Sequence, residues 1–162
     1  MKPINTLLAI LFISLLSSPS WSATLRYLVE REGLHYERFT DVPFNGKVTG
    51  NEQGSFKNGK KEGAWFGYWD NGQLRNQSKY SGGKLEGVFI SYYGNGQLRR
   101  KGNLRSGNLE GAYISYHQNG QLRRKGNFRS GKLEGAYVYH HKDGTVYKPW
   151  SGTFKNGEKI SD

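Results

Sequence analysis

The stretch Tyr92–Gly111, YYGNGQLRRKGNLRSGNLEG, is one copy of a repeat that decides the fold. A Glu-Gly pair recurs every 24 positions along the chain, and an Asn-Gly or Asp-Gly pair recurs at the same interval between them. The Glu-Gly pairs are Glu62-Gly63, Glu86-Gly87, Glu110-Gly111 and Glu134-Gly135, and the others are Asn71-Gly72, Asn95-Gly96, Asn119-Gly120 and Asp143-Gly144. Self-similarity at such an interval indicates stacked units, each too small to bury a hydrophobic face alone.

Within each copy, the turn residues predict a β-hairpin. Asn-Gly is the strongest short-range hairpin signal, because a type I′ turn needs positive φ at both central residues. A second turn signal recurs at Asn58-Gly59, Gly82-Gly83, Ser106-Gly107, Ser130-Gly131 and Asn156-Gly157. Glycines also interrupt every possible helical window. We therefore expect an all-β fold, an elongated antiparallel β-meander of about five stacked hairpins over residues 45–162.

The two ends of the array differ from its middle, as capping repeats do. Residues 45–61 read NGKVTGNEQGSFKNGKK, and residues 143–159 read DGTVYKPWSGTFKNGEK, each with two extra residues after its first turn. Residues 24–44 precede the clear array. Apolar and aromatic residues on both sides of Glu32-Gly33 predict one more hairpin there, which we interpret as an N-terminal cap.

Residues 1–23 have the three-part pattern of a secretory signal peptide. Lys2 supplies a positive start, an apolar run covers residues 7–16, and Pro19 precedes the small residues Ser20, Ser22 and Ala23. The apolar run is shorter than the roughly 20 residues that a membrane-spanning helix needs. We expect cleavage after Ser22 or Ala23 and a periplasmic or secreted protein. Retention of the segment as an uncleaved anchor is the alternative.

The composition limits the classes of partner and chemistry. The 24 basic and 13 acidic residues give a net charge of +11, which favours acidic partners or anionic surfaces. The same surplus would also keep a repeat protein in solution without any partner. Export makes nucleic acid an unlikely natural partner. The absence of cysteine excludes disulfides and thiol chemistry.

The unit Tyr92–Gly111 resembles the MORN-variant repeats of bacterial proteins. The resemblance covers residues 45–159 and rests on the repeat spacing, the turn pairs and the Glu-Gly pairs. It implies an extended β-meander and a protein-binding role. Many members of this family are labelled as the antitoxin component of toxin–antitoxin systems, and MORN repeats are also associated with membrane attachment. A signal peptide does not suit a cytoplasmic antitoxin, whereas an immunity protein acting outside the cytoplasm would fit it.

Alternation of side chains along a strand predicts a basic surface. Counting from the Asn-Gly turn places Leu98 and Arg100 on one face, with Arg99 and Lys101 on the other. The equivalent residues of the next repeat are Arg123 and Lys125, roughly 10 Å away if the hairpins stack regularly. Arg99 with Arg123, and Lys101 with Lys125, would then form basic ladders. These ladders are either an anion-binding surface or a solvated face with the repeated glutamates as partial counter-ions.

The strand after each Glu-Gly pair alternates aliphatic and aromatic side chains. We interpret the aliphatic set, which includes Val88 and Ile90, as core. The aromatic set is Trp65, Phe89, Tyr113 and Tyr137. This column either stacks as core or lines a groove. Because Tyr, Trp and Arg dominate interface hot spots, the aromatic column and the basic ladders form the candidate binding surface.

The sequence offers no catalytic constellation. The repeated glutamates are expected to be structural, because catalysis needs one special site and these residues recur in four copies. His117 and His141 occupy equivalent positions, roughly 10 Å apart, which is too far for one metal ion. We therefore expect no enzymatic activity, metal or cofactor. The predicted function is an exported protein–protein interaction module, antitoxin-like or immunity-like in one form. The alternative is an electrostatic binder of anionic membrane lipid or cell-envelope polymer.

Overall fold

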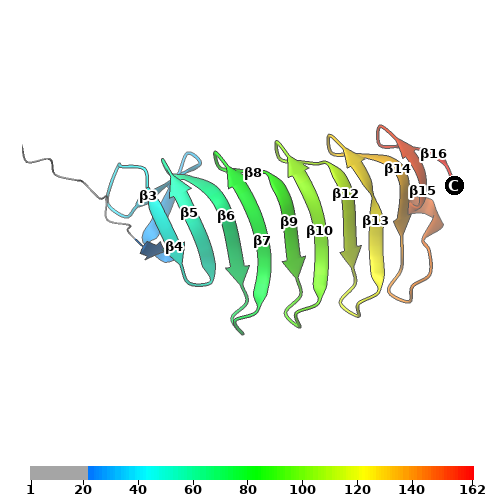
Figure 1. The fold of residues 1–162 in the computed structure, drawn as a ribbon, viewed down its shortest axis with the longest axis horizontal. Coiled ribbons are helices and arrows are strands. Elements are labelled where there is room, and N and C mark those ends of the chain that lie inside the picture. The colour runs from blue at the N-terminus through cyan, green and yellow to red at the C-terminus, as the bar shows by residue number, and fades with distance from the viewer. Residues whose placement is uncertain (1–21) are drawn as a thin grey trace, which may run out of the picture.

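The computed structural model describes residues 22–162, which form an elongated array of β-hairpins (Figure 1). The expected all-β meander of stacked hairpins is confirmed. The predicted signal peptide lies outside the described residues, apart from its last two positions. Within residues 22–162, no helix is long and apolar enough to cross a membrane.

The strands of the array follow the 24-residue repeat. They are β4 (Gly46–Thr49), β5 (Glu52–Lys57), β6 (Lys60–Tyr68), β7 (Leu74–Ser81), β8 (Lys84–Leu85), β9 (Gly87–Tyr92), β10 (Leu98–Arg105), β11 (Asn108–Leu109), β12 (Gly111–Tyr116), β13 (Leu122–Arg129), β14 (Lys132–Tyr139), β15 (Gly152–Lys155) and β16 (Glu158–Ser161). With β1 (Ser22–Thr24), they make one sheet of 14 strands. Every pairing in this sheet is antiparallel except that of β1 with β4, which is parallel.

Different turns close the hairpins at the two long edges of the array (Figure 1). At the Ser-Gly edge both turn residues have positive φ, 51° for Ser106 and 81° for Gly107, as a type I′ turn requires. At the Asn-Gly edge only the glycine does, with φ 82° at Gly96. Gly96 donates its N–H to the carbonyl of Tyr93, and Tyr93 donates to that of Gln97. The type I′ expectation for Asn-Gly is therefore wrong, because these are type I turns followed by a left-handed glycine.

The repeated glutamates tie each hairpin to the next one. Glu86 accepts a hydrogen bond from the N–H of Ser106 at 2.7 Å, and Glu110 accepts one from Ser130 at 2.7 Å. Glu62 and Glu134 make the same contact to Gly82 and Asn156. The expected structural role of these residues is confirmed. Among residues 22–162, none of these four carboxylates forms an ion pair with an arginine.

Replacing Glu110 with alanine is expected to lower the free energy of unfolding by about 1–2 kcal/mol, because a charge-assisted hydrogen bond between two repeats is lost. Chemical denaturation would measure the change. Glu158 is a matched control, since its exposed side chain has no such contact to a later turn. An equal effect of both substitutions would contradict the linking role of Glu110.

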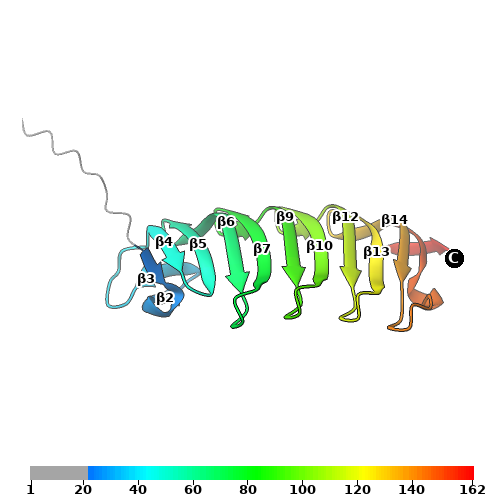
Figure 2. The ribbon, with the colours of Figure 1, turned by 60° about the horizontal axis from the view of Figure 1, so that its bottom comes forward.

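The buried apolar core lies at the N-terminal end of the array. Its members among residues 22–162 are Leu28, Phe44, Val48, Phe56 and Trp65. A separate hairpin of β2 (Leu28–Arg31) and β3 (Leu34–Glu37) turns at Glu32-Gly33 and packs over this end, as Figure 2 shows. The ring of His35 lies 4.6 Å from that of Phe56, and the N–H of His35 donates to the carbonyl of Gly59 at 2.8 Å.

Glycines under the aromatic rings determine which face of the sheet carries the packing. A Cβ atom at Gly54 would lie 2.3 Å from the Trp65 ring, and one at Gly126 would lie 2.6 Å from the Tyr137 ring. At Gly102, a Cβ atom would lie 2.9 Å from the Phe89 ring. The rings therefore rest directly on the backbone of neighbouring strands. This arrangement repeats along one face of the array.

Candidate functional site

The strand register divides the side chains between two faces. Tyr113 lies opposite Gly126, Phe89 lies opposite Gly102, and Arg100 lies opposite both Ser91 and Ser115. Directly opposed residues point to the same side of a sheet. We call this side the aromatic face; it carries Trp65, Tyr80, Phe89, Arg100, Leu104, Tyr113, Arg124, Phe128, Tyr137 and Tyr139. The other side, the aliphatic face, carries Val88, Ile90, Lys101, Ile114 and Lys125.

The aliphatic side chains are not core, contrary to the expectation from the sequence. Ile90 is half-buried and lies outside the buried core. Val88 is 52% exposed, and Ala112 and Ala136 are also exposed. The physical reason is that the rings rest on glycine backbone on the opposite side, so the packing is built there. On the aliphatic face, Val88 and the two alanines line an open hollow of about 720 Å³ together with Lys101 and Lys125.

The predicted basic ladders are also divided between the faces. A β-bulge between Leu98 and Arg100 shifts the pairing by one residue, and the next repeat has a similar shift between Ser115 and Tyr116. Simple alternation therefore fails at this point of the strand. Arg99 lines the hollow on the aromatic face, whereas Lys101 lines the one on the aliphatic face. Arg123 lines a hollow together with Tyr139 of the aromatic face. Lys125, like Lys101, lines the hollow on the aliphatic face.

The predicted aromatic column has two environments. Trp65 is only 1% exposed and belongs to the core. Phe89, Tyr113 and Tyr137 are half-buried and line a hollow of about 810 Å³ with Leu104 and Phe128. Burial raises the pKa of Tyr137, and the nearby Arg124 partly opposes this shift. Trp65 therefore packs as core, whereas the other three rings border a hollow.

Two arginines missed in the sequence reasoning, Arg100 and Arg124, also line this hollow. The guanidinium carbon of Arg100 lies 5.6 Å from the Phe89 ring centre, and that of Arg124 lies 5.3 Å from the Tyr139 ring centre. These distances are within the range of cation–π attraction. The Arg-Arg doublets at 99–100 and 123–124 are the sequence feature from which both arginines of each repeat could have been assigned to the binding surface. Alternation assigned only one arginine of each doublet to the basic surface.

The arginines of the middle repeats have no carboxylate partner among residues 22–162. Arg75, the equivalent of Arg99 one repeat earlier, forms an ion pair with Glu52. No ion pair within these residues involves Arg99, Arg100, Arg123 or Arg124. Moreover, the Nε atoms of Arg123 and Arg124 are buried without a hydrogen-bond partner. These four arginines are therefore without a direct ion pair within the described residues.

The chain itself covers the aromatic face at both ends. The β2–β3 hairpin packs over Phe56 at the N-terminal end, with the His35 contact described above. At the C-terminal end, Trp150 of the short 3-10 helix η2 (Lys148–Trp150) packs edge-on against Tyr139 with ring centres 5.1 Å apart. The surface around Phe89, Tyr113 and the arginines lies between these two covers.

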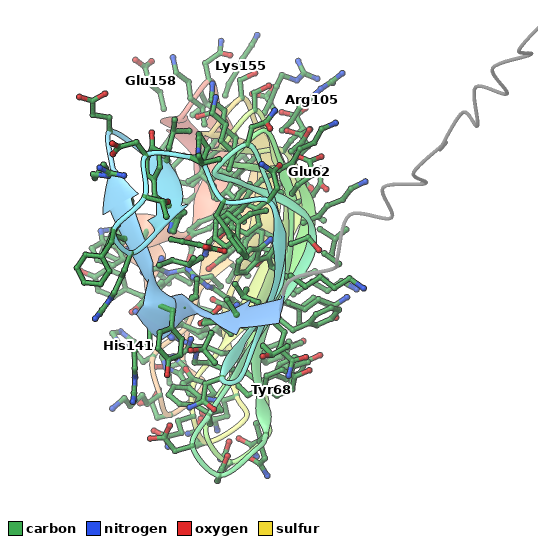
Figure 3. The ribbon with its side chains drawn as sticks, turned by 90° about the vertical axis from the view of Figure 1, so that its left-hand side faces the viewer. Glu62, Tyr68, Arg105, His141, Lys155 and Glu158 are labelled. Atoms are coloured by element: carbon green, nitrogen blue, oxygen red, sulfur yellow. The ribbon has the colours of Figure 1, made fainter. Side chains whose placement is uncertain are left out.

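A second column of rings runs along the Asn-Gly edge at positions 69, 93, 117 and 141. The hydroxyl of Tyr93 donates to the carbonyl of Tyr116 at 2.8 Å, and Nε2 of His117 lies 2.9 Å from the carbonyl of His140. Tyr93, His117 and Arg123 line a smaller hollow of about 350 Å³. Figure 3 shows His141 and Tyr68 in the half of the array away from Glu62 and Arg105. The described residues contain no group of three His, Asp or Glu side chains that could hold a metal ion.

Comparison with known families supports the repeat assignment. The family model of the MORN repeat variant matches residues 61–81, 85–105 and 109–130. These three consecutive stretches run from the start of β6 through β13, and they include Arg99, Arg100, Arg123 and Arg124. No curated protein matches the chain. The MORN-variant repeats indicate a repeat-based binding module, in a family of generally non-catalytic repeats.

Proposed function

We propose that this chain is an exported, non-catalytic interaction module that captures an acidic segment of a partner protein on the open part of the aromatic face. The observation that carries the proposal is the set of four arginines without carboxylate partners within residues 22–162, namely Arg99, Arg100, Arg123 and Arg124. They lie beside half-buried aromatic rings. Arginine and aromatic side chains together are the usual hot spots of protein interfaces.

The contrast with the first repeat explains why the middle repeats favour an acidic partner. Position 52 is Glu, and the equivalent positions in the next three repeats are Asn76, Arg100 and Arg124. Glu52 pairs with Arg75 of the following repeat. In the later repeats, the place of this carboxylate is taken by another arginine. A partner carboxylate can therefore relieve the repulsion between neighbouring arginines, which favours acidic segments over basic ones.

The predicted signal peptide supports export, so we expect the partner in the periplasm or outside the cell. Capture of a toxic protein by this surface would make the chain an immunity protein, the finer role that the family resemblance suggests. The open apolar hollow with Lys101 and Lys125 on the aliphatic face supports the second candidate function, electrostatic binding of anionic lipid or envelope polymer.

A matched pair of double variants separates these functions. Arg100→Gln with Arg124→Gln is expected to weaken capture of the partner by about 100-fold or more, because two interface arginines each contribute roughly 1.5–3 kcal/mol. Lys101→Gln with Lys125→Gln removes the same charge from the opposite face and is expected to leave capture within about threefold of the parent. Pull-down from envelope and secreted fractions, followed by titration of the purified partner, measures both.

The same comparison includes the outcomes that contradict the proposal. Equal weakening by both double variants, with loss of all binding as salt rises, would support the electrostatic lipid or polymer binder instead. Unchanged capture by the arginine variant would exclude the aromatic face as the binding surface.

A further inference from the structure

A row of opposed residues crosses the aromatic face from strand to strand. It runs through Glu52, Gly67, Asn76, Ser91, Arg100, Ser115, Arg124 and Tyr139. The charge along this row changes from negative at Glu52 to positive at Arg100 and Arg124. Ser115 stands between the two arginines and opposes both of them. Adjacent strand backbones lie about 4.8 Å apart, so the backbones of Arg100 and Arg124 flank that of Ser115 on either side at about this distance.

The hydroxyl of Ser115, at the centre of this row, has no hydrogen-bond partner among the described residues. Ser115 is only 5% exposed, and its Oγ atom is buried without a hydrogen-bond partner. Such a group is costly, because a buried hydroxyl loses its bonds to water. Ser91, its equivalent one repeat earlier, differs in this respect, since its Oγ accepts a hydrogen bond from Nε of Arg100 at 3.3 Å.

The two guanidinium groups lean away from Ser115 in opposite directions. Arg100 reaches toward Ser91 and the Phe89 ring, and Arg124 reaches toward the Tyr139 ring. Like charges favour this arrangement. Nε of Arg124 has no hydrogen-bond partner there. Long arginine side chains can change rotamer at low cost, so both can turn back toward an anion above Ser115.

We infer that Arg100, Ser115 and Arg124 form an oxyanion subsite that takes one carboxylate of the partner's acidic segment. This inference rests on the proposed function. A carboxylate has two oxygens and can accept from both guanidinium groups and from the Ser115 hydroxyl at once, in charge-assisted hydrogen bonds. It satisfies the buried hydroxyl and the free Nε of Arg124, and its negative charge offsets the repulsion between the two guanidinium groups. Free phosphate presents the same oxyanion chemistry to the same three groups.

The test uses two small anions as probes, glutarate for a partner carboxylate and inorganic phosphate for a free anion. NMR spectra of the full chain would follow the Nε–H signals of Arg100 and Arg124 and the amide of Ser115 during each titration. With glutarate, these signals are expected to shift together and to saturate at one common concentration. Lys101 and Lys125 on the opposite face are expected to show no saturable shift in that range.

Three variants test the assignment of the subsite. Ser115→Ala is expected to weaken glutarate binding about tenfold, and Arg124→Gln about 30-fold, in line with the loss of one hydrogen bond to a charged group. Ser91→Ala is the matched control, since the Ser91 hydroxyl does not contact the anion and loses only its 3.3 Å bond from Arg100 when Arg100 turns toward Ser115. It is expected to change binding by less than threefold. Equal effects of Ser115→Ala and Ser91→Ala would overturn the subsite. A saturable site for phosphate but not glutarate would overturn the assignment to a carboxylate.

The outcome for the subsite is separable from that for the proposed function. Glutarate binding that responds to Ser115→Ala, combined with partner capture that ignores Arg100→Gln and Arg124→Gln, would keep the subsite and reject the function. Capture that needs both arginines but ignores Ser115→Ala, with no saturable glutarate site, would keep the function and reject the subsite.

Discussion

Replacing Trp65 with alanine is expected to lower the free energy of unfolding by about 3–5 kcal/mol, the range for a large aromatic side chain removed from a core. Trp65 is 1% exposed and packs edge-on against Phe56 and Tyr80, with ring centres 5.0 and 6.0 Å away. Its Nε1–H donates to the carbonyl of Ser55 at 3.2 Å. The ammonium of Lys61 lies 4.2 Å above its ring, in a place where burial lowers the pKa of Lys61. One substitution therefore removes several contacts that join β5, β6 and β7 at this end of the array.

Trp150 provides the control for this prediction. It is the same residue type, but it is 54% exposed, and its ring contacts those of Tyr139 and Tyr147. We expect Trp150→Ala to cost about 1 kcal/mol, as for a half-exposed ring that loses one or two aromatic contacts. Urea unfolding followed by circular dichroism would measure both, since tryptophan fluorescence changes with the substitution itself. Equal destabilisation by the two variants would contradict the position of the core at the N-terminal end.

The second large effect is expected from adding a single methyl group at Gly54. A Cβ atom there would lie 2.3–2.7 Å from three atoms of the Trp65 ring. Gly54 does not have a positive φ, so alanine meets no backbone strain and the effect is steric alone. Because Trp65 is enclosed and cannot move aside, we expect Gly54→Ala to cost about 2–3 kcal/mol, the upper part of the range for overpacked cores.

Gly126 tests whether enclosure of the ring, and not the contact distance alone, sets this cost. A Cβ atom at Gly126 would also be too close, 2.6 Å from the Tyr137 ring, but Tyr137 is half-buried and borders the open hollow. The ring can swing outward, so Gly126→Ala is expected to cost about 1–2 kcal/mol. Gly94→Ala has no neighbouring atom within 4 Å and should be near neutral. We expect the loss of stability to be largest for Gly54→Ala, smaller for Gly126→Ala and smallest for Gly94→Ala. A reversed order of the denaturation midpoints would contradict this prediction.

The thin middle of the array links these stability predictions to binding. The five buried apolar residues among those described all lie at or before Trp65, whereas Phe89, Tyr113 and Tyr137 remain half-buried. Repeats of this kind are stabilised mainly by their neighbours. A partner that covers the open aromatic face would add burial where the chain has least of its own. Binding should therefore raise the unfolding temperature of the protein.

The hairpin unit, its repeat length and the antiparallel stacking of the units could all be predicted from the sequence. These features depend on short-range turn chemistry and on a 24-residue period, both of which can be read from neighbouring letters. The structural role of the repeated glutamates also followed from their recurrence. The φ values at Asn-Gly did not, because Asn95 accepts a hydrogen bond from the N–H of Gln97 and only Gly96 is left-handed.

Which side chains share a face of the sheet became clear only from the pairing of the strands. A β-bulge at Leu98–Arg100 adds one residue to a strand without any change in its hydrophobic pattern, so alternation placed Arg99 beside Lys101 when the strand register separates them. Burial was decided in the same way, since Gly54, Gly102 and Gly126 lie under rings of adjacent strands. The row Arg100–Ser115–Arg124 arises from the pairing of three strands. The physical reason is that strand register and bulges depend on contacts between strands, which the spacing within one strand does not specify.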